Sequence, residues 1–202
     1  MTGDPASRRG FLKAAGGVGA GGALGLFAVA CGEDEEPKPE TATTNDLDIV
    51  NYALGLEYVE HDFYRAVIGA KILSGRDLTI ARRIESNEAE HVKALEAAAR
   101  NLDGEPAPRE ETDFSSVLGV GRGKVLRTAA TLEGVGAGAY LGQVRFVESK
   151  EILASLLSIH SVEGRHAAVL NRLVGRPFSP AGAFAEPLSK EQVTKAIEPY
   201  LA

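Results

Sequence analysis

Apolar positions recur every three to four residues along four long stretches of the chain, and segments rich in glycine and proline separate these stretches. Such spacing places the apolar side chains on one face of a helix. Asn45 or Thr44 can cap the first helix and Asp77 the second, while Gly75 and Gly104 can end them. Alternation typical of strands is nearly absent. The pattern predicts an all-α domain with helices over about 46–73, 78–102, 123–148 and 150–174.

The links between the predicted helices differ in length. A few residues join the first helix to the second and the third to the fourth, which favours two antiparallel hairpins. The link 103–122 has twenty residues, long enough to run the length of a bundle. We therefore expect a four-helix bundle over 46–175 with one long crossover. The Pro-rich segment 176–202 is expected to end in a short helix, opened by a Ser189-x-x-Gln192 capping box, that packs on the bundle.

The two predicted hairpins resemble each other in sequence. Residues 84–95 read IESNEAEHVKAL and residues 159–170 read IHSVEGRHAAVL, with Ile, Ser, Glu, His and Leu at matching places. Residues 56–64 read LEYVEHDFY and residues 132–140 read LEGVGAGAY, with Leu, Glu, Val and Tyr in common. Each half thus carries a glutamate followed about thirty residues later by Glu-x-x-His, an internal repeat of one helical hairpin.

These glutamates and histidines fall on the apolar stripes of their helices. Residues three apart share a helix face, and the stripe of the first Glu-x-x-His motif also holds Ile84 and Leu95. An uncompensated buried carboxylate costs several kcal/mol, whereas two divalent cations would neutralise four carboxylates. Solvent-exposed Glu–His pairs are the alternative. The predicted metal ligands are Glu57, Glu88, His91, Glu133, Glu163 and His166.

One glutamate from each of two helices and Glu-x-x-His from each of the other two is the ligand set of ferritin-like di-iron and di-manganese proteins. Over about residues 46–201 the chain resembles the ferritin-like superfamily, in particular secreted bacterial ferritin-like domain proteins related to desiccation-related proteins. The resemblance implies a ferritin-like bundle and a dinuclear carboxylate centre as cofactor. Nitrogen and oxygen ligands without thiolate favour two iron or two manganese ions.

Four other side chains near the motifs have open roles. Glu60 aligns with Gly136 in the repeat, so Glu57 is the predicted ligand, and Glu60 either contacts a ligand or is solvated. Tyr64 and Tyr140 either pack in the core or donate a hydrogen bond to a ligand carboxylate. His160, like His61, is expected outside the ligand set, with an auxiliary or gating role for His160 as the alternative.

Glycines on the third predicted helix are unusual, because each costs up to about 1 kcal/mol relative to alanine inside a helix. They are Gly134, Gly136 and Gly138. Close packing of helices and space for a small oxidant are both consistent with them.

The first thirty residues predict a targeting segment. Residues 7–13 read SRRGFLK, which is similar to the twin-arginine export signal, and an apolar Gly-rich run of about 17 residues follows, marginal for a spanning helix. A transmembrane anchor is the alternative. Twin-arginine export carries folded proteins, so the resemblance implies metal loading in the cytoplasm.

Cys31 is the only cysteine, which excludes a disulfide framework. The preceding Ala28-Val29-Ala30 suits ordinary signal peptidase, whereas a new N-terminal Cys31 resembles an acylated bacterial lipoprotein, the interpretation that we favour. Residues 31–45 are acidic and contain proline, which is typical of a flexible tether. We therefore expect an extracytoplasmic protein anchored to a membrane by a lipid.

The full chain has a net charge of −6 and 44% hydrophobic residues, an ordinary globular composition. No basic patch indicates a nucleic-acid partner. The expected partners are metal ions, small oxidants and, through Cys31, a membrane, and a homodimer stays open.

The leading hypothesis for function is a dinuclear centre that reacts with O₂ or H₂O₂, as in a ferroxidase, an oxidase or a peroxide-consuming protein. The chain has no Cys-x-x-Cys for a rubredoxin-like electron donor, and a lipid tether would suit a closed storage cage poorly. A manganese catalase-like activity is a third reading. The alternative from another class is a non-enzymatic envelope protein, related to stress or desiccation, in which the metal site is structural or lost.

Overall fold

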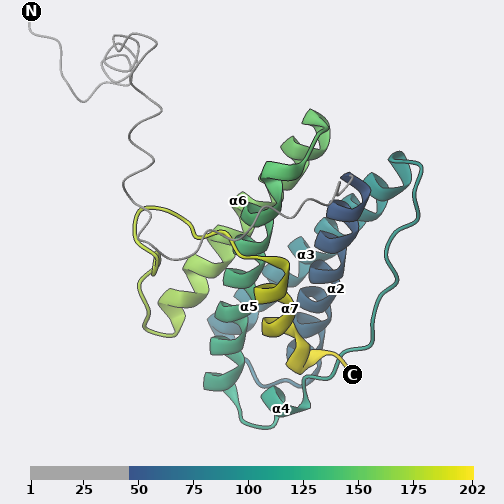
Figure 1. The fold of residues 1–202 in the computed structure, drawn as a ribbon. Coiled ribbons are helices and arrows are strands. Elements are labelled where there is room, and N and C mark those ends of the chain that lie inside the picture. Colours follow the sequence, from purple (N-terminus) through teal and green to yellow (C-terminus); the bar gives the residue numbers. More distant parts are fainter. Residues whose placement is uncertain (1–45) are drawn as a thin grey trace, which may run out of the picture. The chain divides into compact units, whose positions relative to one another are not determined.

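The computed structural model describes residues 46–202, which form a bundle of four long helices (Figure 1). Helix α2 packs mainly on α3, and α5 mainly on α6, so the bundle consists of two hairpins. Within 46–202 there is no strand, only a single antiparallel bridge between Thr112 and Leu201. The predicted all-α four-helix bundle is confirmed. The long helices are α2 (Asp46–Gly69), α3 (Gly75–Asn101), α5 (Arg122–Gln143) and α6 (Lys150–Leu173).

Four short helical segments complete the described part of the chain. The crossover between α3 and α5 runs along the bundle and contains α4 (Ser115–Leu118) (Figure 1). A 3-10 turn, η1 (Val144–Phe146), follows α5, while α7 (Lys190–Ile197) and η2 (Glu198–Tyr200) end the chain.

Two large apolar clusters and a small third one form the core. On α3, α5 and α6 the glutamates and histidines of the predicted site lie between the residues of one large cluster and those of the other, and on α2 Glu57 lies close to the point where the two clusters meet. The bundle therefore contains a polar layer between two apolar regions that exclude water. The first cluster includes Phe63, Ile84, Phe114, Leu126 and Leu170, and the second includes Ile49, Leu54, Leu95, Tyr140 and Leu156.

Several predicted helix ends were wrong. Helix α2 ends at Gly69 rather than near residue 73, and Lys71 then adopts a positive φ of 55° in the turn. Helix α3 begins at Gly75 with Ser74 as its N-cap, so Asp77 is not the cap. The Asp77 carboxylate instead accepts a hydrogen bond from Arg122 Nε at 2.5 Å. The third helix ends at Gln143, before its expected end at residue 148.

The C-terminal helix α7 lies against α2 and α5. Ser189 and Gln192 form the capping box, and the buried Val193 packs with Leu56 and Ala139. The segment before α7 also approaches α5 closely, because the Leu188 amide donates to the Gly138 carbonyl at 2.9 Å.

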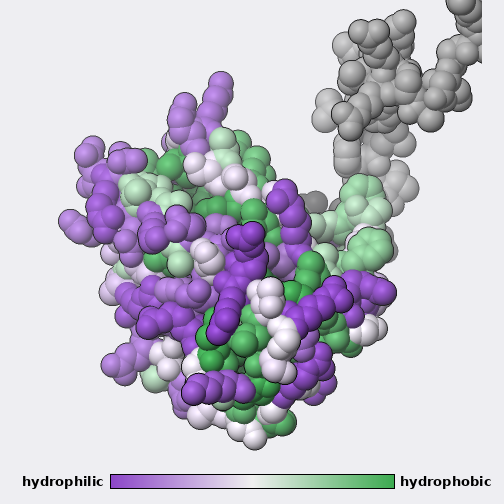
Figure 2. Space-filling model, turned by 180° about the vertical axis from the view of Figure 1, so that it is seen from behind, coloured by the Kyte–Doolittle hydropathy of each residue, from purple (hydrophilic) through white to green (hydrophobic). Residues whose placement is uncertain are grey.

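No helix within residues 46–202 is both long enough and apolar enough to cross a membrane. Hydrophilic residues cover much of the face seen from behind in Figure 2, with apolar residues scattered among them. The predicted export signal (1–30), the tether (31–45), Cys31 and the caps Thr44 and Asn45 lie outside the described residues.

Candidate metal centre

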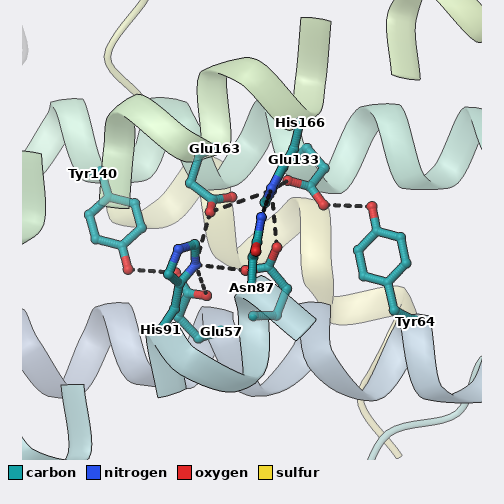
Figure 3. A network of polar contacts seen from close by, with 9 residues as sticks. Glu57, Tyr64, Asn87, His91, Glu133, Tyr140, Glu163 and His166 are labelled. Atoms are coloured by element: carbon teal, nitrogen blue, oxygen red, sulfur yellow. Dashed lines mark hydrogen bonds and ion pairs between the residues drawn. The ribbon is translucent and has the colours of Figure 1, made fainter. Parts of the chain in front are cut away.

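The six predicted ligands meet in the polar layer at the middle of the bundle (Figure 3). Helix α2 supplies Glu57, α3 supplies Glu88 and His91, α5 supplies Glu133, and α6 supplies Glu163 and His166. The four glutamates have no exposed surface, and His91 and His166 are 9% and 6% exposed. Exposed Glu–His pairs, the alternative considered for the sequence, are therefore excluded.

Ligand atoms of these residues form two overlapping groups of four. In each group, one atom from every residue lies within 4.8 Å of the others. Glu88 and Glu163 belong to both groups, so each has one carboxylate in position to be shared by two ions. The first group is Glu57, Glu88, His91 and Glu163, and the second is Glu88, Glu133, Glu163 and His166.

Both imidazoles turn Nδ1 toward the carboxylates. His91 Nδ1 lies 2.8 Å from Glu88 Oε2 and 3.2 Å from Glu57 Oε2. His166 Nδ1 lies 3.0 Å from Glu133 Oε2 and 3.0 Å from Glu88 Oε1. Within the described part of the chain, the four carboxylates form ion pairs with these histidines and with no lysine or arginine.

Burial raises the pKa of three of the carboxyl groups, whereas hydrogen bonds lower the pKa of the fourth. Burial raises the pKa of Glu57 to about 7 and raises that of Glu133 as well. Burial and the nearby Glu133 raise the pKa of Glu163 well above its usual value. Burial also opposes ionisation of Glu88, but hydrogen bonds from His166 and His91 lower its pKa to about 2.

Without metal ions, the protonated histidines supply the positive charge that balances the carboxylates. Burial disfavours the imidazolium form, yet hydrogen bonds to Glu163, Glu57 and Glu88 raise the pKa of His91 to about 12. Bonds to Glu133 and Glu88 likewise raise the pKa of His166 to about 9. Divalent cations would take the place of these protons, because four carboxylates and two imidazoles fit two such ions by charge and by donor type.

Glu57 and Glu133 each belong to just one of the two groups. Each of them accepts a hydrogen bond from a tyrosine of the other hairpin. Tyr64 on α2 donates to Glu133 Oε1 at 2.5 Å, and Tyr140 on α5 donates to Glu57 Oε1 at 2.6 Å (Figure 3). Both tyrosines are buried. They therefore pack in the core and also hold the two carboxylates in place.

Of the remaining residues expected near the site, Glu60 lies beside the ligands, whereas His160 and His61 do not. Glu60 is buried with 3% exposure, so the solvated alternative for it was wrong. His160 lies outside the cluster, with Nδ1 at 3.0 Å from the Ala137 carbonyl oxygen. His61 also lies outside it and pairs with Glu85.

Asn87 is a contact of the site that the sequence did not indicate. Its side-chain Nδ2 lies 2.9 Å from His166 Nε2, the ring nitrogen that faces away from the carboxylates. In the repeat, Asn87 corresponds to Val162. Because the contact exists at one end of the site only, a search for repeated residues could not detect it.

Comparison with known families gives one result. Residues 45–176, more than half of the chain, match the model of a family described as ferritin-like domain. The matched range contains all six residues of the two groups. No curated protein matches the chain.

Proposed function

The chain belongs to the ferritin-like domain family, and from this premise we propose that it binds two iron or two manganese ions and reacts with O₂ or H₂O₂. The observation that carries the proposal is the pair of overlapping four-residue groups that share Glu88 and Glu163. Bound ions of this kind would supply one-electron and two-electron redox chemistry. Carboxylates can change between shared and single binding as the charge of the ions changes.

The protein's own residues hold the ions and limit access. Glu57 with His91, and Glu133 with His166, would define the two ends of the centre, while Tyr140 and Tyr64 orient the two end carboxylates. The side chains of His91 and His166 keep 11% and 8% exposure, whereas the carboxylates keep none. This narrow exposure favours small oxidants over bulky organic substrates.

Export and lipid attachment are part of the proposal. The similarity of residues 7–13 to the twin-arginine signal supports export, and Cys31 after the apolar run supports acylation. Expression of the full chain and of a Cys31→Ala variant in a bacterium, followed by cell fractionation, tests this part. The full chain should stay in the membrane fraction and the variant should leave it.

The central test is the metal content of the purified protein. We expect two iron or manganese ions per chain after growth with both metals, and a change of the optical spectrum with turnover when peroxide is added. The identity of the metal separates a ferroxidase-like reaction from a catalase-like one. Bound metal that is silent to peroxide and O₂ would overturn the redox proposal and favour a structural site in an envelope stress protein.

Substitutions test the assignment of the ligands. Glu88→Ala and His166→Ala should lower the metal content, because each removes a donor from the second group and Glu88 serves both groups. Glu96→Ala is a matched control, since Glu96 lies on α3 outside both groups. Full metal occupancy in both ligand variants would disprove the assignment.

A further inference from the structure

Helices α2 and α5 face each other about an approximate two-fold axis. Tyr140 of α5 meets Glu57 of α2, and Tyr64 of α2 meets Glu133 of α5. The matching stretches are therefore antiparallel, and their midpoints, Glu60 and Gly136, lie opposite each other. A Cβ atom at Gly136 would be 2.7 Å from Glu60 Oε1. Only one of the two repeats can carry a large side chain at this position, and here it is a glutamate.

Glu60 has no evident structural partner. It is 3% exposed, and its Oε2 atom is buried without a hydrogen bond or ion pair in the described part of the chain. Burial and the neighbouring Glu163 raise the pKa of Glu60 well above its usual value. A buried acid without a donor or cation is costly, and a leucine at this position would avoid that cost. The position of the acid is therefore better explained by a cation than by packing.

The carboxylate of Glu60 lies beside the shared ligand Glu163. Glu60 Oε1 and Glu163 Oε2 come within 2.7 and 3.2 Å of the same point, the place of an absent Cβ at Gly136. Glu163 Oε2 is likewise buried without a hydrogen-bond partner. Glu60 Oε2, the atom without a partner, also lies 3.3 Å from that point, so two carboxylate oxygens without donors converge on the α2–α5 side of the centre. The two histidines come from α3 and α6.

We propose that Glu60 is a seventh metal ligand. It binds the same ions as Glu163 and approaches them from the α2–α5 side. The inference rests on the proposed function, because it requires ions in the two groups. In the structure Glu60 lies outside both groups, so its side chain turns toward Glu163 when it binds. A fifth carboxylate exceeds the charge of two divalent ions and therefore stabilises trivalent ions over divalent ones.

The test compares the redox behaviour of iron in the wild-type protein and in the variant Glu60→Gln. Both are loaded with Fe(II) without oxygen, their iron per chain is counted, and the midpoint potential is measured by titration with mediators. We expect two ions in both proteins. The ratio of affinities for Fe(III) and Fe(II) should fall at least tenfold in the variant, which moves the potential upward by about 59 mV or more for one electron. Glu96→Gln is the matched control and should not move it.

A second variant separates ligation from the effect of a nearby charge. Glu60→Asp keeps the negative charge but shortens the side chain, so a ligand is lost while most of the electrostatic effect remains. A shift in both variants supports ligation. A shift in Glu60→Gln alone, or in neither, overturns the proposal although the metal centre stands. A wild-type protein without bound iron would instead refute the proposed function itself.

Discussion

At the scale of single residues, Tyr64 and Tyr140 link the two hairpins by hydrogen bonds to ligand carboxylates. Each phenol donates to the carboxylate of the opposite hairpin at 2.5–2.6 Å, the short distance typical of a bond to a charged acceptor. Such a bond fixes the orientation of a ligand and tunes its basicity. The two ends of the centre should therefore respond to different tyrosines.

We expect Tyr64→Phe to lower the affinity for the ion bound by Glu133 and His166. Tyr140→Phe should lower the affinity for the ion bound by Glu57 and His91. The loss should be roughly tenfold to hundredfold, as for other residues that hold a metal ligand. Stepwise titration with Mn²⁺, followed by electron paramagnetic resonance, measures the two steps.

Tyr58→Phe provides the control for this comparison, because Tyr58 donates to Glu96 at 2.9 Å, and Glu96 belongs to neither group. That variant should leave both steps unchanged. If the two buried tyrosine variants weaken the same step, the separate roles of the tyrosines are refuted.

The six ligand candidates could be predicted from the sequence because the repeat presents each pattern twice. Residues that occur once carry no such signal. Asn87 and Glu60 correspond to Val162 and Gly136 in the other half. Whether Glu60 is solvated or buried depends on the register between α2 and α5, which no local pattern determines.

At the scale of elements, the glycines of α5 have different roles. Gly134 has open space where a Cβ would lie, and Gly136 faces Glu60. A Cβ at Gly138 would be 2.7 Å from Leu188 Cγ, and one at Gly142 would overlap the backbone carbonyl of Leu188. Close packing therefore accounts for the last two, which make room for the segment that leads into α7.

Alanine substitutions on this helix should have opposite effects. Gly142→Ala should lower the free energy of unfolding by roughly 1–3 kcal/mol, because the backbone of Leu188 has to move. Gly134→Ala should raise it by up to about 1 kcal/mol through helix propensity alone. Urea denaturation of both variants measures the difference. Equal effects would contradict the close contact between α5 and the segment before α7.

Helix ends were harder to predict than helices. Asp77 has the side chain of a good cap, but it bonds to Arg122, which is distant in sequence. Ser74, three residues earlier, is an equally favoured type of cap residue, and the helix begins directly after it. The short α4 helix has four residues, too few to show a period. The hairpins and the long crossover, in contrast, follow from segment lengths alone.

At the scale of the whole molecule, a charged layer inside an apolar bundle makes stability depend on pH. The pKa of Glu57 is about 7 in the fold and 4.5 for the free group. Because the pKa is raised, Glu57 contributes stability that is fully present below pH 4.5 and is lost as the pH rises through about 7. His91, with its pKa raised from 6.5 to about 12, acts in the same direction at higher pH.

In the presence of a chelator, the melting temperature should therefore be lower at pH 8 than at pH 5. Glu88 acts in the opposite direction, since its lowered pKa adds stability above pH 4.5 that is lost toward pH 2. Metal binding requires deprotonated ligands, so added Mn²⁺ should raise the melting temperature more at pH 8 than at pH 5. Calorimetry at both values checks this, and a chelated protein more stable at pH 8 would contradict it.

The single acid opposite Gly136 also makes the two hairpins unequal partners. Either hairpin, paired with a copy of itself, would bring together two glutamates and two Glu-x-x-His motifs. Two first hairpins, however, would set two Glu60 carboxylates against each other at the axis, and two second hairpins would leave a gap between two glycines. The halves are thus complementary rather than interchangeable, and this asymmetry selects the mixed pair over self-association of like halves.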